Sequence, residues 1–180
     1  MKLLSLVAAL ALTAAIPGTT FAQAASEPQA AGAVNFTRWE GRWYEVARNS
    51  NWPQRNCGPE VVATVLRRVD GDISMIHQCK TDDGDWNVWI GLGRPDDPQP
   101  GTLGVRFVSE WYTLPAFTWG SYYALALDLE ARYALLGSTD RDYLWILSQT
   151  RTMDEAVYQQ AVARAGQLGF DTSKLTRTAK

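Results

Sequence analysis

The chain has 180 residues, of which 46% are hydrophobic and 20% are charged, a composition typical of a single globular domain. Its 17 Lys and Arg residues against 19 Asp and Glu residues give a formal net charge of -2, which leaves no cationic excess to neutralise a nucleic acid backbone. One histidine and two cysteines are too few for a dedicated zinc site. We therefore expect no nucleic acid partner, no metal and no cofactor.

The N-terminus has the pattern of a secretory signal peptide, which we place at residues 1–24. A short positive segment precedes the uninterrupted apolar run Leu3–Ala15, and small residues follow at the candidate cleavage sites Ala22 and Ala24. The run is shorter than the roughly 20 apolar residues of a transmembrane helix. Because no cysteine lies near the cleavage site, we expect no covalent lipid anchor and a periplasmic or secreted protein.

Residues 25–34 are rich in Ala, Ser, Pro, Gln and Gly and lack large apolar side chains, so we expect a flexible leader. The folded domain is expected over residues 35–180.

Cys57 and Cys79 are the two cysteines of the chain. In an oxidising compartment a lone pair is expected to form a disulfide, here across a predicted hairpin. The sequence leaves one alternative open, in which one of them is a free, reactive thiol inside a pocket.

From Trp43 onward the chain consists of short segments with strand character, separated by turn signals such as Asp70-Gly71. The predicted strands are Trp43–Arg48, Val61–Val69, Ile73–Cys79, Trp86–Leu92, Leu103–Ser109, Ser121–Asp128, Arg132–Ser138 and Tyr143–Thr150. Eight strands with short connections predict an all-β antiparallel meander, either a closed barrel or a sandwich.

One helix is predicted after the strands. Thr152 is the expected cap, and Asp154 and Glu155 lie in the first turn, where negative charge suits the helix dipole. The helix is expected to end at Gly166 or Gly169. Its expected apolar face consists of Ala156, Val157, Ala161 and Leu168.

Three motifs in this order resemble the lipocalin family. They are a Gly-x-Trp signature at Gly41 and Trp43, the turn Thr139–Tyr143, and the strand 143–148. Residues 35–175 are similar to the bacterial outer-membrane lipocalins and the apolipoprotein D-like group. The resemblance implies an eight-stranded antiparallel up-and-down β-barrel with one C-terminal α-helix packed outside. It also implies structural roles for Gly41, Trp43, Thr139, Asp140 and Tyr143.

The chain departs from the family pattern after its third motif. The family has an Arg there that packs across the signature Trp, whereas this chain has Gln149. Either Arg141 or Arg151 takes over this contact, or the closed end of the barrel is held differently. Bacterial members of the group are also typically lipid-anchored, through a cysteine that this chain lacks.

The resemblance implies an exported carrier that binds fatty acids, lysophospholipids or similar small amphiphiles in its barrel, for membrane lipid transport or storage. Strand alternation, with its parity taken partly from the resemblance, assigns an inward set that is nearly free of charge, as an apolar ligand requires. Ile73, Leu103 and Ala126 belong to this inward set as well. The expected ligand-binding residues are Val61, Ala63, Val65, Met75, His77, Val105, Phe107, Tyr122 and Ala124.

Burial of a 16-carbon acyl chain gives on the order of 10 kcal/mol before ordering costs, with little discrimination between chains. We therefore expect a broad acyl-chain preference, with any selectivity coming from polar groups at the mouth. The candidates for these groups are His77, Tyr112, Tyr122 and Arg106. His77 is equally open to a purely structural role inside the barrel. We expect any contact with membranes to be transient.

No catalytic residue is expected, and two alternatives to a carrier stay open. The first is a lipid-modifying enzyme that uses Cys57 or Cys79 as a free cavity thiol. The second is an interaction module whose barrel is filled by its own side chains and whose aromatic segment Trp111–Trp119 binds a partner. A Ser hydrolase is not expected, because His77 would have to be its base and the chain has no Gly-x-Ser-x-Gly elbow. Asp140 and Asp142 are expected to form a turn rather than a pair of catalytic acids.

Overall fold

The computed structural model describes residue 34 and residues 36–49, 54–96, 102–108, 120–128, 130 and 132–178. The predicted signal peptide, the leader up to residue 33 and the segment Trp111–Trp119 lie outside the described residues.

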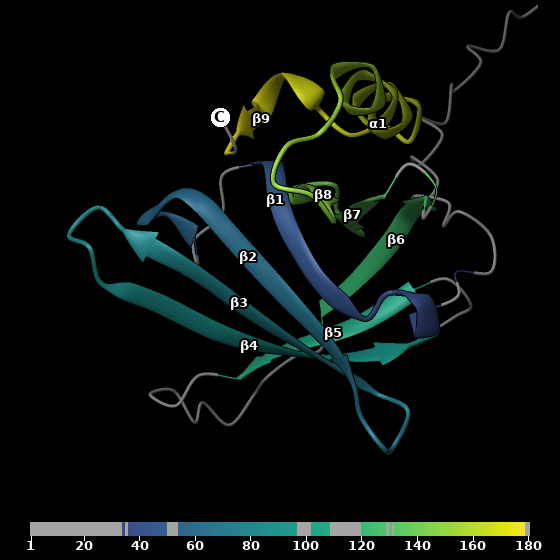
Figure 1. The fold of residues 1–180 in the computed structure, drawn as a ribbon. Coiled ribbons are helices and arrows are strands. Elements are labelled where there is room, and N and C mark those ends of the chain that lie inside the picture. The colour runs from purple at the N-terminus through teal and green to yellow at the C-terminus, as the bar shows by residue number, and fades with distance from the viewer. Residues whose placement is uncertain are drawn as a thin grey trace, which may run out of the picture.

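The described residues form an antiparallel barrel, as the alternating sequence predicts (Figure 1). Nine strands follow the order β2-β3-β4-β5-β6-β7-β8-β1-β9, and β1 also pairs with β2, which closes the barrel. The strands are β1 (Gly41–Asn49), β2 (Cys57–Arg67), β3 (Ile73–Thr81), β4 (Trp86–Pro95), β5 (Thr102–Val108), β6 (Gly120–Asp128), β7 (Tyr133–Ser138), β8 (Leu144–Ser148) and β9 (Leu175–Arg177). All eight predicted strands are confirmed, while β9 is an addition.

Side chains along each strand alternate between the interior of the barrel and its outer surface. In β2, Val61, Ala63 and Val65 are buried, while Val62 and Thr64 between them are partly exposed. A register shift in β6 between Ala124 and Ala126 interrupts this alternation. Ala126 therefore packs on the outside, against the helix-side cluster, and its predicted inward position is wrong.

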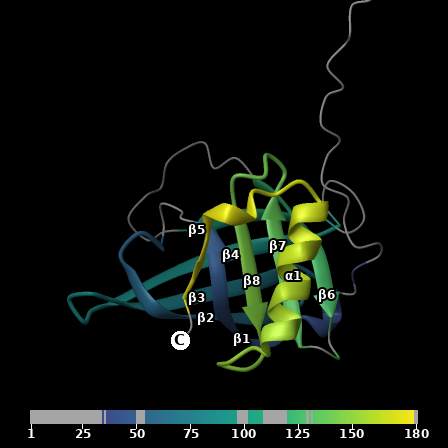
Figure 2. The same ribbon diagram turned by 90° about the horizontal axis from the view of Figure 1, so that it is seen from above.

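The helix α1 (Glu155–Gln167) lies outside the barrel, beside β6, β7 and β8 (Figure 2). Asp154 caps it by accepting hydrogen bonds from the backbone N–H groups of Ala156 and Val157, so the predicted Thr152 cap is wrong. Its buried residues are Tyr158, Ala161 and Ala165. Of the predicted face, Ala161 is confirmed and Val157 and Leu168 pack partly buried against the same cluster, whereas Ala156 is exposed. Within the described residues, no helix is long and apolar enough to cross a membrane.

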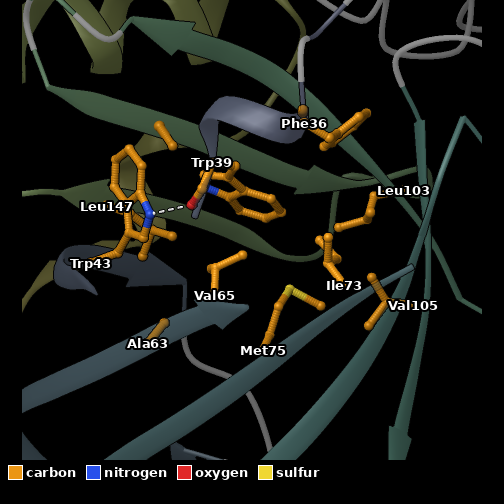
Figure 3. Close-up of a cluster of buried hydrophobic side chains, with 12 residues drawn as sticks. Phe36, Trp39, Trp43, Ala63, Val65, Ile73, Met75, Leu103, Val105 and Leu147 are labelled. Carbon is orange, nitrogen blue, oxygen red and sulfur yellow. Dashed lines mark hydrogen bonds between the residues drawn. The ribbon is translucent and has the colours of Figure 1, made fainter. Parts of the chain in front are cut away.

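Trp43 fills the closed end of the barrel and is fully buried. Its indole Nε1 donates a 2.9 Å hydrogen bond to the carbonyl of Trp39, which follows the short 3-10 helix η1 (Phe36–Arg38) (Figure 3). The two arginines considered for the contact across Trp43 act elsewhere. Arg141 donates to the carbonyl of Leu168 at the end of α1, and Arg151 pairs with Glu60. The closed end is thus held by Trp39.

The strand β1 changes partners along its length. Gly41–Tyr44 pairs with β2, whereas Ala47–Asn49 pairs with β9. A second 3-10 helix, η3 (Thr172–Lys174), leads into β9, and Thr178 after it donates its backbone N–H to the carbonyl of Val46. The backbone ladder between β1 and β2 therefore ends at Tyr44, well before the open end of β1.

A disulfide joins Cys57 of β2 to Cys79 of β3, as predicted. The Cα atoms are 5.5 Å apart, and Cys79 is completely buried. Because these are the two cysteines of the chain, neither is a free thiol, and the cavity-thiol alternative is wrong.

Candidate ligand-binding cavity

An apolar cavity of about 50 Å³ lies inside the barrel, above the core cluster around Trp43. Seven strands contribute to its wall, because inward side chains of β1, β2, β3, β5, β6, β7 and β8 converge on the barrel axis. It is lined by Glu45, Val61, Ala63, Met75, His77, Leu103, Val105, Tyr122, Leu136, Trp145 and Leu147.

Six of the nine predicted ligand-binding residues line the cavity. The residues concerned are Val61, Ala63, Met75, His77, Val105 and Tyr122. Val65 and Ala124 are buried in the core cluster nearer the closed end instead. The side chain of Phe107 lies outside the described part of the structure.

The predictions missed four lining residues, Glu45, Leu136, Trp145 and Leu147. Leu103, which also lines the cavity, was predicted to point inward but was not among the predicted ligand-binding residues. The signal for them was present as alternation. Glu45 lies two residues after the inward Trp43 on β1, and Trp145 and Leu147 alternate on β8 with the outward Leu144 and Ile146.

A polar network crosses the cavity wall at Glu45. Arg48 and the side-chain amide of Gln54 both donate to its carboxylate, and Trp145 donates a 2.9 Å hydrogen bond from Nε1 to Oε1 of Gln54. Burial raises the pKa of Glu45, while Arg48 and Gln54 act in the opposite direction. The network ties β1 to β8 through Gln54, so the carboxylate is held by the protein rather than presented to a ligand.

His77 lines the cavity from β3 and stacks on Trp89, its cross-strand neighbour, with ring centroids 5.1 Å apart and planes inclined by 7°. Burial lowers the pKa of His77 from 6.5 to about 4, so the imidazole is neutral at neutral pH. The imidazole ring therefore presents a polar but uncharged surface to a ligand.

Tyr122 is the other predicted polar contact that reaches the cavity. Burial, followed by the charges of Tyr143 and Asp140, raises the pKa of its phenol, which keeps the hydroxyl protonated. Of the other head-group candidates, Tyr112 lies outside the described residues. Arg106 alternates with the inward Leu103 and Val105 and lies on the opposite face of β5.

Asp140 has the contacts of a turn residue. Its carboxylate accepts from the hydroxyl of Ser138 and, at 3.0 Å, from the backbone N–H of Asp142, and the hydrogen bond from Ser138 lowers its pKa. Ser138 also accepts a 3.0 Å hydrogen bond from the backbone N–H of Tyr143. These bonds hold the turn between β7 and β8. In the described residues, no group of three or more His, Cys, Asp or Glu side chains could hold a metal ion.

Comparison with known proteins agrees with this architecture. A family model described as a lipocalin-like domain matches residues 34–180. The outer membrane lipoprotein Blc of Citrobacter freundii is 38% identical over 140 residues, which cover 77% of this chain and 75% of that protein. Blc of Escherichia coli strain K12 is 35% identical over 179 residues, or 97% of this chain and 95% of Blc. The solved structure of apocrustacyanin C1 matches with a TM-score of 0.65 at 18% identity, over 81% of this chain and 79% of that one.

Proposed function

We propose that this chain, which belongs to the lipocalin family, is a carrier of fatty acids, lysophospholipids or similar small amphiphiles, and that it binds their acyl chains in the barrel cavity. The observation that carries the proposal is the apolar lining of the cavity, to which aliphatic and aromatic side chains of six strands contribute. The family membership supports binding of a small hydrophobic ligand. That this ligand is an acyl chain is part of the proposal.

The size of the cavity sets a condition on this proposal. Its volume of about 50 Å³ is far below the roughly 300 Å³ at which ligand pockets begin, so a whole acyl chain enters only when lining side chains move. Met75 is suited to this movement because its unbranched side chain adapts to different shapes. We therefore expect binding to be coupled to side-chain rearrangement.

The small cavity also favours a second candidate function. A barrel largely filled by its own side chains has little room for cargo and acts instead through its outer surface. In this case the protein is an interaction module, and it binds no lipid in the barrel.

Native mass spectrometry and a matched pair of variants separate the two functions. Protein purified without detergent from its native compartment is expected to carry a stoichiometric mass that resolves into fatty acid or lysophospholipid on extraction. Ala63→Phe fills the cavity and is expected to weaken fatty acid binding by about tenfold or more, measured by quenching of tryptophan emission.

The control is Thr64→Phe, because Thr64 lies on the outer face of the same strand and lines no part of the cavity. It is expected to bind fatty acid as the wild type does. Circular dichroism establishes that both variants are folded. A wild type that has its bare mass and shows no quenching on titration contradicts the carrier and leaves the interaction module.

We also propose that the carrier acts in an exported, oxidising compartment, the periplasm or the medium. The disulfide between Cys57 and Cys79 supports this proposal because structural disulfides are rare in reducing cytosol. The Blc relatives are named as outer membrane lipoproteins, which agrees with export.

A further inference from the structure

A second hollow lies on the outer surface of the barrel, over β1, β2 and β3 and the residues that follow β8. It consists of two adjoining depressions of about 320 and 410 Å³, each larger than the barrel cavity. Tyr44, Glu60 and Arg151 line both, so the two are continuous, and we call them the lateral groove. Figure 1 shows that α1 covers a different side of the barrel from β3 and β4. The groove also contains Arg42, Lys80 and Trp86.

The lateral groove is a local concentration of positive charge in a chain whose formal net charge is -2. Arg42, Lys80 and Arg151 are its cations, and Glu45 and Glu60 are its acids. Arg151 pairs with Glu60 and also lies 5.1 Å from the ring centroid of Tyr44. Arg42 and Lys80 have no carboxylate partner among the described residues. Because Glu45 is bonded to Arg48 and Glu60 to Arg151, the charges of Arg42 and Lys80 are the ones that no carboxylate of the groove neutralises.

The apolar part of the groove lies beside these cations. Trp86 is 66% exposed, and Nζ of Lys80 lies 5.8 Å from its ring centroid. Val62 contributes an aliphatic surface from the neighbouring strand. Adjacent cationic and apolar surfaces suit an amphiphilic ligand at the junction of its head group and its chain.

The groove adjoins the barrel cavity. Glu45 and Val61 line both spaces. At this level no backbone ladder joins β1 to β2, because their pairing ends at Tyr44 and Val62. The groove and the cavity are therefore separated by these two residues, beside the hydrogen bonds of Thr178 to the carbonyls of Glu45 and Val46, and not by a continuous ladder between β1 and β2.

We propose that the lateral groove binds the anionic head group, a carboxylate or a phosphate, of an amphiphile whose chain reaches the cavity between β1 and β2. This assignment rests on the proposed function for the binding of the chain. Arg42 and Arg151 are the expected contacts of the oxyanion, with Lys80 nearby. The cavity itself offers an anion no Arg or Lys among its lining residues, and Arg48 is already bonded to Glu45 in its wall.

The charge pattern favours a single head group over an extended anionic membrane surface. The turn between Lys80 and Trp86 contains Asp82, Asp83 and Asp85, three acids next to the groove. A densely anionic surface would meet these carboxylates together with the cations, whereas one oxyanion reaches the cations alone.

Two ligands with the same acyl chain test the proposal, lysophosphatidic acid as the anion and monoacylglycerol as the neutral amphiphile. The double variant Arg42→Gln/Arg151→Gln is expected to lose about tenfold in affinity for the anion and to keep its affinity for the neutral amphiphile within about twofold. The matched control is Arg67→Gln/Arg68→Gln, which removes the same charge from the β2–β3 turn and lines no part of the groove. It is expected to bind both ligands as the wild type does.

The outcomes distinguish this proposal from the carrier function. If the double variant binds both ligands as the wild type does, the head group lies elsewhere and the assignment fails, while the carrier function stands. A wild type that binds neither ligand overturns both. Inorganic phosphate is the third probe. If it binds the wild type as tightly as lysophosphatidic acid does, the groove is a site for a free anion, and the assignment to a lipid head group is wrong.

Discussion

His77 illustrates how burial changes what a side chain can contribute to binding. Its residue type makes it a candidate for meeting a fatty acid carboxylate, but the low pKa of about 4 removes the charge at neutral pH. In the folded protein the ring instead stacks on Trp89 inside the barrel. The only histidine of the chain is thus a neutral part of the cavity wall.

The pKa of His77 predicts a pH dependence of stability. A histidine in the unfolded chain titrates near 6.5, so between pH 6.5 and 4 the unfolded state binds more protons than the folded state. Acidification through this window therefore destabilises the fold, by up to about 3 kcal/mol from this one group. The variant His77→Gln lacks the effect. We expect the difference in free energy of unfolding between wild type and variant to fall as the pH is lowered from 7 to 4, measured with urea.

Glu45 acts in the opposite sense, because its raised pKa makes protonation favourable to the folded state. The contribution of Glu45 to the free energy of unfolding is the same in the wild type and in His77→Gln, so it cancels when the two proteins are compared. A difference that stays constant from pH 7 to pH 4 would show that His77 titrates as a solvated histidine.

At the scale of elements, the contact between β7 and the segment after α1 depends on a residue without a side chain. A Cβ atom on Gly137 would overlap the ring of Phe170 and lie 2.8 Å from Cδ1 of Leu125. Both neighbours are buried beneath α1. We expect Gly137→Ala to destabilise the protein by about 1–3 kcal/mol in urea unfolding, because the packed neighbours have to shift.

The matched control is the same substitution at Gly166 in the last turn of α1, where the nearest atom, Cγ2 of Thr172, lies 4.0 Å from the added Cβ. Gly166→Ala is expected to be neutral or to stabilise by up to about 1 kcal/mol, since alanine is the better helix former. Equal effects of the two substitutions would contradict close packing at Gly137.

The strands were predictable because period-two alternation is strong where one face is buried, as along Val61–Val65. The features that could not be predicted depend on tertiary contacts. β9 has three residues and forms only because β1 offers it a free edge. The bulge in β6 reverses the parity of Ala126, and no residue at that point signals it. The helix cap lies at Asp154, two residues after the predicted Thr152, because helix boundaries are the least certain part of a sequence-based prediction.

The cavity was predictable to a similar extent. Alternation gave the inward residues of β2, β3 and β5, but it did not give their depth, so Val65 and Ala124 belong to the core rather than the cavity. The lateral groove was not predicted at all. It brings Arg42, Lys80 and Arg151 together from three separate parts of the chain, and only the closure of the barrel makes them neighbours.

At the scale of the whole molecule, barrel closure depends on a short seam. Four residue pairs, from Gly41 with Val65 to Tyr44 with Val62, join β1 to β2. Beyond them each side of the seam is held by another part of the chain. On one side β1 is held by β9 and by Thr178, whose hydroxyl donates a 2.8 Å hydrogen bond to the carbonyl of Glu45. On the other side the disulfide holds the start of β2 to β3.

The disulfide is therefore expected to stabilise both the whole fold and this edge of β2. A sequence separation of 22 residues gives a stabilisation of about 3 kcal/mol through the entropy of the unfolded chain. We expect reductant to lower the free energy of unfolding of the wild type by about this amount. The double variant Cys57→Ser/Cys79→Ser is expected to match the reduced wild type and to show no response to reductant.

Hydrogen exchange locates the same effect. On reduction, the backbone amides of Cys57, Gly58 and Glu60 are expected to exchange faster, because this part of β2 has lost the disulfide and has no ladder to β1. The amides of Gly41–Tyr44 lie within the paired seam and act as the internal control. If both segments lose protection together, the seam opens as one unit with the whole barrel. If neither changes while global stability falls, the disulfide acts on the unfolded state alone and does not hold this edge of β2 in the folded protein.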